Sequence, residues 1–223
     1  MRFERAAIGL EGLRDRGGLP LPSGSDLLTP RFTDGRPGPR LDVPATARRA
    51  AVLVLVHPAE DGEALVVLTE RTTYAGLHSG EVSFPGGKSE PEDRDAGATA
   101  LREAEEEVGL DVRAAGVEAI GILDEVWIPV SDFRITPVVA IATRTPVLTA
   151  APSEVARILT PSVDAFLPDA PIEIVDRLVR DWPLRFGGYR VDGLHVWGAT
   201  ARILGQLGAV IAAAPRTGPG GSR

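Results

Sequence analysis

Short hydrophobic runs rich in β-branched residues recur through the middle of the chain, and this pattern predicts strands. Residues 51–56 and 64–69 are predicted as two strands joined by a turn. A further strand is expected at residues 81–84, and later runs at 117–123 and 133–142 predict two more. Because these strands follow one another at short intervals, we expect them to form one or more sheets.

Two segments have helical periodicity instead. The clearest is 96–108, where Asp93 or Asp95 is placed to cap the first turn and Gly109 stands where a left-handed C-terminal cap belongs. The segment 197–211 places hydrophobic residues at helical spacing and predicts a second helix. Strands around a few helices predict an α/β fold with a mixed sheet sandwiched between helices.

The remaining segments give weaker patterns. Residues 17–44 are dense in proline and other turn formers, so we interpret residues 1–45 as an extended N-terminal arm. The segment 150–194 predicts only irregular structure with short elements. Residues 46–214 are then the folded domain, and the Gly/Pro/Ser-rich residues 215–223 a flexible tail.

The amino-acid composition argues against several classes of protein. The 223 residues carry a net charge of −7, which argues against broad capture of nucleic acid or of an anionic membrane. There is no cysteine, so a disulfide framework, a Cys-based zinc site and a thiol nucleophile are excluded. Neither a secretory signal nor a run of about 20 apolar residues is present. We expect a cytoplasmic protein with a small-molecule partner, and a homodimer stays open.

The predicted helix at 96–108 concentrates acidic residues. At about 100° per residue, Glu103, Glu106 and Glu107 share one face, and Glu105 points away from it. Like charges at this spacing destabilise a helix by about 0.2–0.5 kcal/mol per pair, and carboxylates in the last turn oppose the helix dipole. A hard divalent cation such as Mg²⁺ would reverse both effects. The alternative for three glutamates alone is a solvated acidic face.

The surrounding sequence favours the metal site. Phe84-Pro85-Gly86-Gly87 precedes the predicted helix. The second half of the helix and its end read Arg102-Glu103-Ala104-Glu105-Glu106-Glu107-Val108-Gly109-Leu110. Together they resemble the signature of the Nudix hydrolases. Two departures concern Asp93, which replaces a glutamate of the pattern and is followed by one inserted residue, so that a strict count lands on Arg94. The resemblance implies the Nudix α/β/α sandwich and metal-dependent hydrolysis of a pyrophosphate.

A second motif narrows the resemblance. The segment from Leu68 to Gly87, which reads LTERTTYAGLHSGEVSFPGG, is similar to the motif that precedes this signature in coenzyme A pyrophosphatases. It implies cleavage of coenzyme A or acyl-CoA to adenosine 3′,5′-bisphosphate and 4′-phosphopantetheine or its acyl form. Two alternatives stay open: a Nudix hydrolase acting on another nucleoside diphosphate derivative or a nucleoside triphosphate, and a non-hydrolytic nucleotide-sensing module.

The resemblance also implies roles for the helix residues. Glu103, Glu106 and Glu107 would hold Mg²⁺ or Mn²⁺, with the Gly87 carbonyl as a further ligand. Arg102 would fix a glutamate of the same helix through a salt bridge.

For the general base and the substrate contacts, the sequence offers several candidate residues. The base is Glu103 or Glu154, with Glu125 as an unassigned alternative, and Glu154 can equally be an ordinary loop carboxylate. Arg71 and His78 in the second motif, and Lys88 after the glycine pair, are candidate substrate-binding residues. The non-functional alternatives are that Arg71 is an ordinary surface arginine, that His78 stabilises a loop by a hydrogen bond, and that Lys88 is an ordinary surface lysine.

Overall fold

The computed structural model describes residues 1–14, 20–38, 43–72, 80–129, 131–179 and 181–213. The helices and short 3-10 turns are α1 (Phe3–Glu11), η1 (Asp26–Leu28), α2 (Ala96–Val108), α3 (Val112–Ala115), η2 (Val163–Phe166) and α4 (Gly198–Ala212). The strands are β1 (Arg31–Phe32), β2 (Arg48–Pro58), β3 (Ala64–Val66), β4 (Leu68–Arg71), β5 (Val82–Ser83), β6 (Gly86–Lys88), β7 (Val117–Ile122), β8 (Val126–Ile128), β9 (Phe133–Ala142), β10 (Val155–Leu159), β11 (Glu173–Val179), β12 (Trp182–Val191) and β13 (Leu194–Val196).

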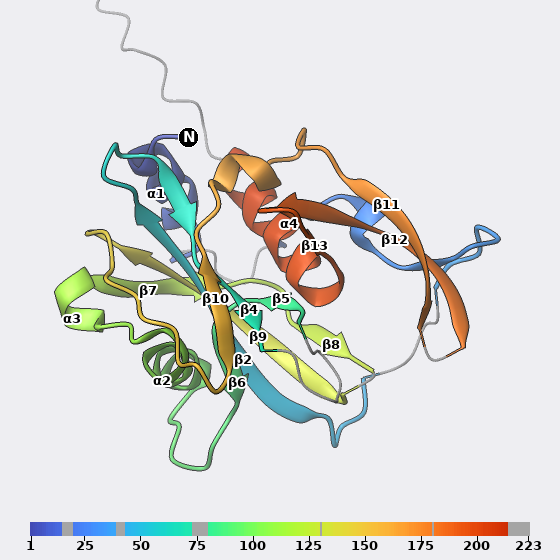
Figure 1. Ribbon diagram of the computed structural model, residues 1–223, viewed down its shortest axis with the longest axis horizontal. Helices are drawn as coiled ribbons and strands as arrows, with labels where there is room; N and C mark the ends of the chain where they lie inside the picture. Colours follow the sequence, from blue (N-terminus) through green and yellow to red (C-terminus); the bar gives the residue numbers. More distant parts are fainter. Residues whose placement is uncertain (15–19, 39–42, 73–79, 130, 180, 214–223) are drawn as a thin grey trace, which may run out of the picture.

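The central sheet is mixed and has β2 and β9 at its centre (Figure 1). These two strands pair in parallel from Arg48 opposite Phe133 to Val56 opposite Ile141. The other neighbours are antiparallel: β3 and β6 pair with β2, and β7 and β8 pair with β9. A parallel pair needs a crossover connection, and α2 lies within the connection between β2 and β9.

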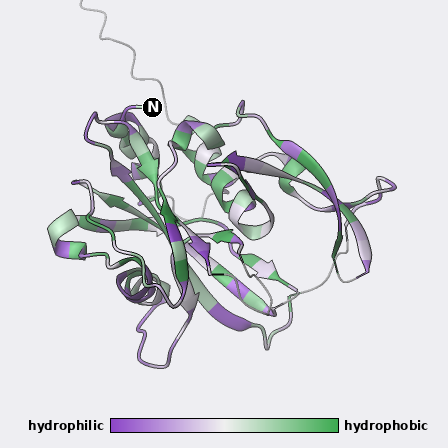
Figure 2. Cartoon of the chain, viewed as in Figure 1, coloured by the Kyte–Doolittle hydropathy of each residue, from purple (hydrophilic) through white to green (hydrophobic). Residues whose placement is uncertain are grey.

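Alternation along β2 explains why both faces of this sheet are covered. Ala51, Leu53 and Leu55 are buried against α2, whereas Val52, Val54 and Val56 belong to the core under α1 and α4. In Figure 2 the central strands and α4 are largely hydrophobic, whereas hydrophilic residues gather on the loops and outer turns. The result is the predicted α/β/α sandwich with a mixed sheet, which is confirmed.

The helix α2 begins and ends where the sequence predicts. The Asp95 carboxylate accepts a hydrogen bond from the Ala98 N–H at 2.8 Å and so caps the first turn. Gly109 closes the helix at φ 64° and donates its N–H to carbonyls of the last turn. The helix packs on the sheet through Ala100, Ala104 and Val108, and of its glutamates Glu107 is buried as well.

Two smaller sheets complete the domain. One has the order β10-β4-β5, and the other has the order β1-β12-β11, with β13 also on β12. The segment 150–194 was predicted to hold only irregular structure with short elements. It holds the short elements β10 and η2, but the prediction is wrong for its second half, which forms the hairpin strands β11 and β12. The β11–β12 hairpin extends from the body at the right of Figure 1, and none of the β11 residues is buried.

The N-terminal residues were predicted to form an extended arm, but residues 3–11 form the helix α1. The helix α1 packs on α4 and places Ala6 and Leu10 in the main core. Gly9 permits this close approach, because a Cβ there would lie 2.9 Å from the Ile211 carbonyl oxygen. Residues 215–223 lie outside the described residues, so the predicted tail and the domain limits stay predictions.

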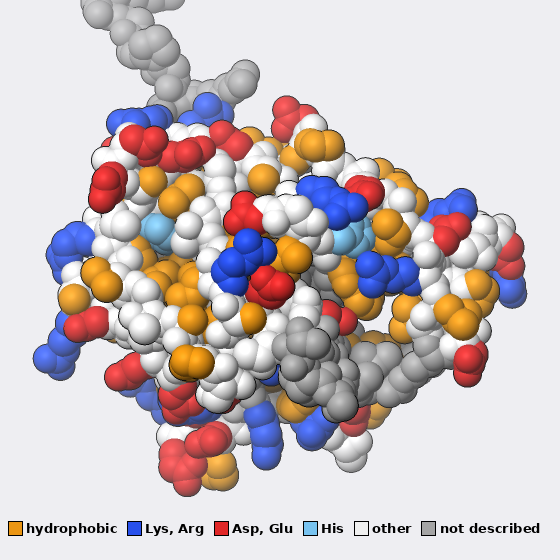
Figure 3. All heavy atoms as spheres, in the orientation of Figure 1, with side chains coloured by type: hydrophobic (Ala, Val, Ile, Leu, Met, Phe, Trp, Pro, Cys, Tyr) orange, Lys and Arg blue, Asp and Glu red, His pale blue; other side chains and the backbone are white. Residues whose placement is uncertain are grey.

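Acidic and basic side chains are interspersed on the face shown in Figure 3. No helix in the described part of the chain is long and apolar enough to cross a membrane.

Candidate active site

Glu107 is a buried carboxylate at the centre of the candidate site. Only 4% of the residue is exposed, and its Oε2 accepts a hydrogen bond from the Gly86 N–H at 3.2 Å. Burial raises the pKa of Glu107 to about 7, against the opposing effects of the Gly86 N–H and Arg71. Nearby Glu103 and Glu154 raise it further. The folded chain therefore keeps a carboxylate where its negative charge is poorly compensated.

Glu103 lies one turn earlier and faces the same glycine pair. A Cβ on Gly87 would stand 2.5–2.6 Å from the Glu103 carboxylate atoms, so only glycine allows this approach. The pKa of Glu103 is also raised, first by burial and then by Glu106 and Glu154, while Arg102 opposes the shift. The β5–β6 segment thus brings backbone and two carboxylates together.

Arg102 connects this helix face to the preceding loop. Its Nε and Nη2 donate to the two oxygens of Asp93 at 3.2 and 3.1 Å, and its Nη1 donates to Glu103 at 2.9 Å. The Lys88 carbonyl oxygen accepts another hydrogen bond, at 3.1 Å from Nη2. Charge-assisted bonds of this kind are the strong ones, and with the planar guanidinium they fix the orientation of the Glu103 side chain.

The structure resolves which residue occupies the uncertain position before the helix. Asp93, not Arg94, pairs with Arg102, and it also accepts hydrogen bonds from the Thr99 hydroxyl and the Glu90 N–H, both at 2.9 Å. These contacts, led by that of Arg102, hold the pKa of Asp93 well below its usual range. Because α2 begins at Ala96, the inserted residue is accommodated in the loop.

Glu106 differs from its two neighbours. Its side chain is 59% exposed, and its Oε2 accepts a hydrogen bond from Arg102 Nη1 at 3.2 Å. The three glutamates therefore share a helix face as predicted, but only Glu103 and Glu107 are turned to the glycine backbone. Glu106 lies at the rim, next to the arginine.

Arg71 and Glu154 approach the site from the neighbouring sheet. Arg71 ends β4, and its Nη1 lies 4.0 Å from Glu107 Oε1. Val155 of β10 pairs with Arg71, and the Glu154 carbonyl accepts the Thr72 N–H at 3.0 Å, which places Glu154 beside the end of β4. A cation and a third carboxylate thus flank Glu103 and Glu107.

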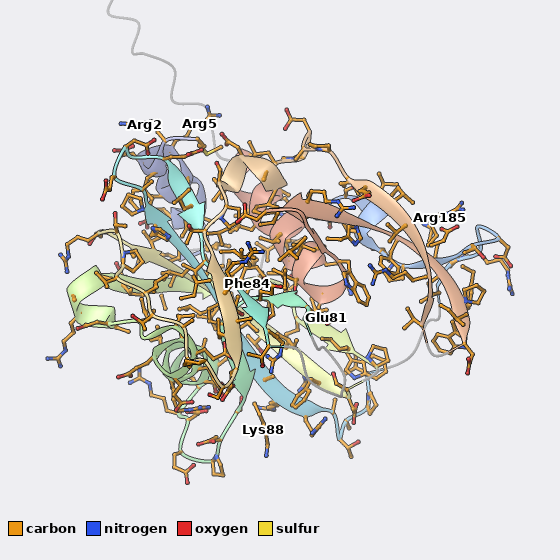
Figure 4. The ribbon with its side chains drawn as sticks, in the orientation of Figure 1. Arg2, Arg5, Glu81, Phe84, Lys88 and Arg185 are labelled. Carbon is orange, nitrogen blue, oxygen red and sulfur yellow. The ribbon has the colours of Figure 1, made fainter. Side chains whose placement is uncertain are left out.

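Two other residues singled out by the sequence, Lys88 and Glu125, are not brought to this cluster. The Lys88 side chain is exposed and extends away from the body in Figure 4. The Glu125 carboxylate accepts a hydrogen bond from the Thr136 hydroxyl at 3.0 Å and lines a cleft of about 340 Å³, whose walls also include Asp93 and Thr99. His78 lies outside the described residues.

The donor chemistry fits a hard divalent cation. As the side chains stand, no three His, Asp or Glu side chains of the described ranges are gathered closely enough to hold a metal ion. Carboxylate and carbonyl oxygens are nevertheless the ligands that Mg²⁺ and Mn²⁺ prefer, and Gly87 leaves the space beside Glu103 without a side chain. A cation here would compensate the buried charge of Glu107.

The sequence missed two contributors to this geometry. One is the Gly86 N–H, a backbone donor that no side-chain pattern reveals. The other is Thr99, whose hydroxyl supports Asp93 from a fully buried position. A threonine on the packed side of a predicted helix is a weak signal, because such residues are often structural.

Comparison with known proteins shows which family of proteins this chain is similar to. The model of the NUDIX domain matches residues 47–167. The chain is 37% identical over 170 residues to Nudix hydrolase 22, chloroplastic, of Arabidopsis thaliana, covering 74% of this chain and 55% of the relative. It is 36% identical over 163 residues to Nudix hydrolase 15, mitochondrial, of the same plant, covering 70% and 56%. The chain thus spans about half the length of these two relatives.

A bacterial relative is covered more completely. The uncharacterized Nudix hydrolase NudL of Citrobacter koseri is 35% identical over 178 residues, covering 75% of this chain and 85% of the relative. Among solved structures, the Nudix hydrolase RenU of M. smegmatis matches with a TM-score of 0.52 at 20% identity, over 85% of this chain and 97% of that one. The structural likeness concerns the fold alone.

Proposed function

The chain belongs to the Nudix family, and on this premise we propose that it is a metal-dependent pyrophosphohydrolase that cleaves coenzyme A and acyl-CoA. The products are adenosine 3′,5′-bisphosphate and 4′-phosphopantetheine or its acyl form. The reaction is hydrolysis of a phosphoanhydride bond, in which water supplies the oxygen that one phosphoryl group gains.

One observation carries the hydrolytic part of this proposal. Glu107 is buried and Glu103 is half-buried against the Gly86–Gly87 backbone, at a cost that is visible in the raised pKa of both groups. If the helix only presented a solvated acidic face, Glu107 would be exposed, whereas only 4% of it is. Buried carboxylates of this kind are typical of sites that bind cations.

The residues divide into three roles. Glu103, Glu106 and Glu107, with the Gly87 carbonyl, would hold Mg²⁺ or Mn²⁺, which when bound neutralises pyrophosphate charge and lowers the pKa of a water molecule. Arg102 orients Glu103 and Glu106. Arg71, at the rim of the cluster, is placed to donate to a phosphate oxygen.

Glu154 is our candidate for the general base. It lies on a loop beside the end of β4, and its charge affects the pKa of both Glu103 and Glu107, so it is close to the cluster without belonging to α2. A base must stand within reach of the attacking water and must not be consumed as a ligand. Glu103 is the alternative, whereas the Glu125 carboxylate accepts its hydrogen bond from Thr136 of β9.

Coenzyme A as the substrate rests on the similarity of the segment from Leu68 to Gly87 to the motif of coenzyme A pyrophosphatases. Part of this segment, residues 73–79, lies outside the described residues and includes His78. His78 is proposed as a substrate-binding residue on sequence grounds alone. The small-molecule partner and the cytoplasmic location stay predictions, and two relatives are named as chloroplastic and mitochondrial forms.

A substrate panel tests the proposal. The chain is incubated with coenzyme A, acetyl-CoA, ADP-ribose, a dinucleotide and a nucleoside triphosphate, each with Mg²⁺ or Mn²⁺, and products are identified by mass. We expect coenzyme A and acetyl-CoA to have the highest kcat/KM and activity to vanish in chelator. Turnover of the other substrates with coenzyme A left intact would refute the substrate assignment, and equal activity in chelator would refute the metal site.

Variants separate substrate recognition from catalysis. Arg71→Ala should reduce kcat/KM for coenzyme A by about 10- to 100-fold, because one charge-assisted contact to phosphate is lost. If the motif reads coenzyme A, the loss for a generic nucleoside diphosphate derivative is smaller. Lys88→Ala is the matched cationic control, since its side chain is directed away from the cluster.

A further inference from the structure

Within the described part of the chain, the β11–β12 hairpin has an open edge. The strand β12 lies between β11 and β1, whereas β11 is the last strand in the order β1-β12-β11 (Figure 1). The hairpin closes from the pair Val179–Trp182, and β11 pairs with β12 as far as Glu173 opposite Gly188. An unpaired edge of this length is a template for another strand, and proteins normally cover or block it.

The hydrogen-bonding groups on this edge follow from the hairpin register. In a two-residue hairpin the closing pair is hydrogen-bonded, and bonded pairs then alternate along the ladder. The N–H and C=O groups of Val179, Arg177 and Val175 are therefore directed to β12. Those of Ile174, Asp176 and Leu178 are directed to the open edge. The same three residues carry exposed side chains, all on one face of the hairpin.

Two of these exposed side chains are large and aliphatic. Ile174 is 43% exposed and Leu178 is 71% exposed. Between them Asp176 accepts two hydrogen bonds from Arg185 of β12, at 2.7 Å from Nε and 2.8 Å from Nη2. Figure 4 shows Arg185 on this outer strand pair. The edge thus presents an aliphatic residue, a neutralised carboxylate and a second aliphatic residue.

This order is self-complementary under a two-fold axis through Asp176. An antiparallel copy of β11 then places Ile174 opposite Leu178 twice, and all three outward-facing residues pair. On the other face, Glu173 of one copy lies diagonally across from Arg177 of the second, so charges of opposite sign approach. The two Asp176 side chains meet at the centre, but each already carries its own Arg185.

Neighbouring registers leave the two exposed aliphatic side chains apart. A shift of two residues toward the turn places the two Arg177 side chains opposite each other, and like charges in that position are destabilising. The shift in the other direction places Val175 opposite Val175 and Glu173 opposite Arg177, but Ile174 then faces Asp176 and no longer meets Leu178. The pairing centred on Asp176 is the one in which the exposed Ile174 and Leu178 cover each other.

We propose that a second copy of this chain pairs with the β11 edge in antiparallel orientation, with Asp176 on the two-fold axis. The two hairpin sheets then form one continuous sheet in the order β1-β12-β11-β11-β12-β1. This interface is independent of the proposed catalytic function, since Glu103 and Glu107 lie on α2 in another part of the domain.

Cross-linking tests the register, because the natural chain has no cysteine to interfere. In an Asp176→Cys variant the two thiols stand on directly opposite residues, about 5.5 Å apart at Cα, which a disulfide spans. Mild oxidation should give a covalent dimer on a non-reducing gel. In Leu178→Cys, which is equally accessible, the two thiols are separated by four residues, roughly 14 Å along the strands, and should not cross-link. Equal cross-linking of both variants, or of neither, overturns the proposed pairing.

Mass measurement tests the interface without a thiol. By light scattering, the wild-type chain should have twice its chain mass of 23.5 kDa. Ile174→Lys should raise the dimer dissociation constant at least about tenfold, because both copies carry the change. Val147→Lys replaces an aliphatic residue that is 88% exposed elsewhere and should leave the dimer intact. A monomeric wild type, or a dimer that Ile174→Lys leaves unchanged, overturns the proposal; equal thermal melts confirm that both variants are folded.

Discussion

Replacing Glu107 by glutamine should stabilise the metal-free protein, and the gain should depend on pH. The pKa of Glu107 is about 7 in the folded chain, against an ordinary value of 4.5. Each pKa unit corresponds to 1.36 kcal/mol, so ionised Glu107 disfavours the folded state by roughly 3 kcal/mol. Glutamine keeps the shape and retains an oxygen that can accept the Gly86 N–H.

The direction follows from proton binding. The folded state holds the Glu107 proton more tightly than the unfolded state, so folding loses free energy as pH rises through 4.5 to 7. The penalty is absent below the unfolded pKa and is complete above about pH 7. Wild type should therefore lose roughly 3 kcal/mol relative to Glu107→Gln between pH 4 and pH 8, or about 6–12 °C in melting temperature for a chain of this size.

Thermal melts in chelator across this pH range measure the difference. Glu105→Gln is the matched control, because Glu105 is exposed on the same helix and its replacement should give a small difference that varies little with pH. Adding Mg²⁺ should stabilise wild type by binding to the folded state and should stabilise Glu107→Gln less. If wild type and Glu107→Gln differ by the same amount at every pH, the burial cost assigned to Glu107 is wrong.

Three further predictions concern the same site. Gly87→Ala should lower metal affinity in a Mg²⁺ titration of the rate, since the new Cβ meets the Glu103 carboxylate, whereas Gly12→Ala has no contact closer than 4.0 Å and should have no effect. Asp93→Asn should raise the Mg²⁺ midpoint. Because the pKa of Asp93 is lowered, the stability that this variant loses relative to wild type should shrink as the pH falls below 3.8. A loss of stability that stays constant with pH would contradict the ion pair. Glu154→Gln should lower kcat with an unchanged Mg²⁺ midpoint, and wild-type kcat at every pH would remove it as the base.

The parts of the fold that sequence predicted are those with a periodic buried face. The bounds of α2 and β9 agree with the predictions, because α2 has both caps in its sequence and β9 ends in a continuous buried run from Pro137 to Ala142. The hairpin β11–β12 was missed for the opposite reason. The strand β11 has no buried residue, and β12 contains Pro183 and the pair Gly187-Gly188, which normally argue against a strand.

The site was predicted in outline and differs in its details. Periodicity placed Glu103, Glu106 and Glu107 on one face but could not show that Glu107 is buried and Glu106 exposed. That difference comes from the β5–β6 segment, which covers only part of the helix face. Counting along the signature left Asp93 and Arg94 open, and only three-dimensional pairing with Arg102 decides between them.

The parallel pairing of β2 with β9 also constrains how the chain is made. When β2 leaves the ribosome, its hydrophobic residues have no partner on the β9 side until roughly 80 more residues have been added, which takes about 4–16 s at 5–20 residues per second. During that interval Val52 to Val56 can pair only with β3 and β6. Such long-range pairing makes folding slow and leaves an apolar strand edge exposed to other nascent chains. Expression at lower temperature or with chaperones should therefore raise the yield of folded protein more than any change in the carboxylate helix.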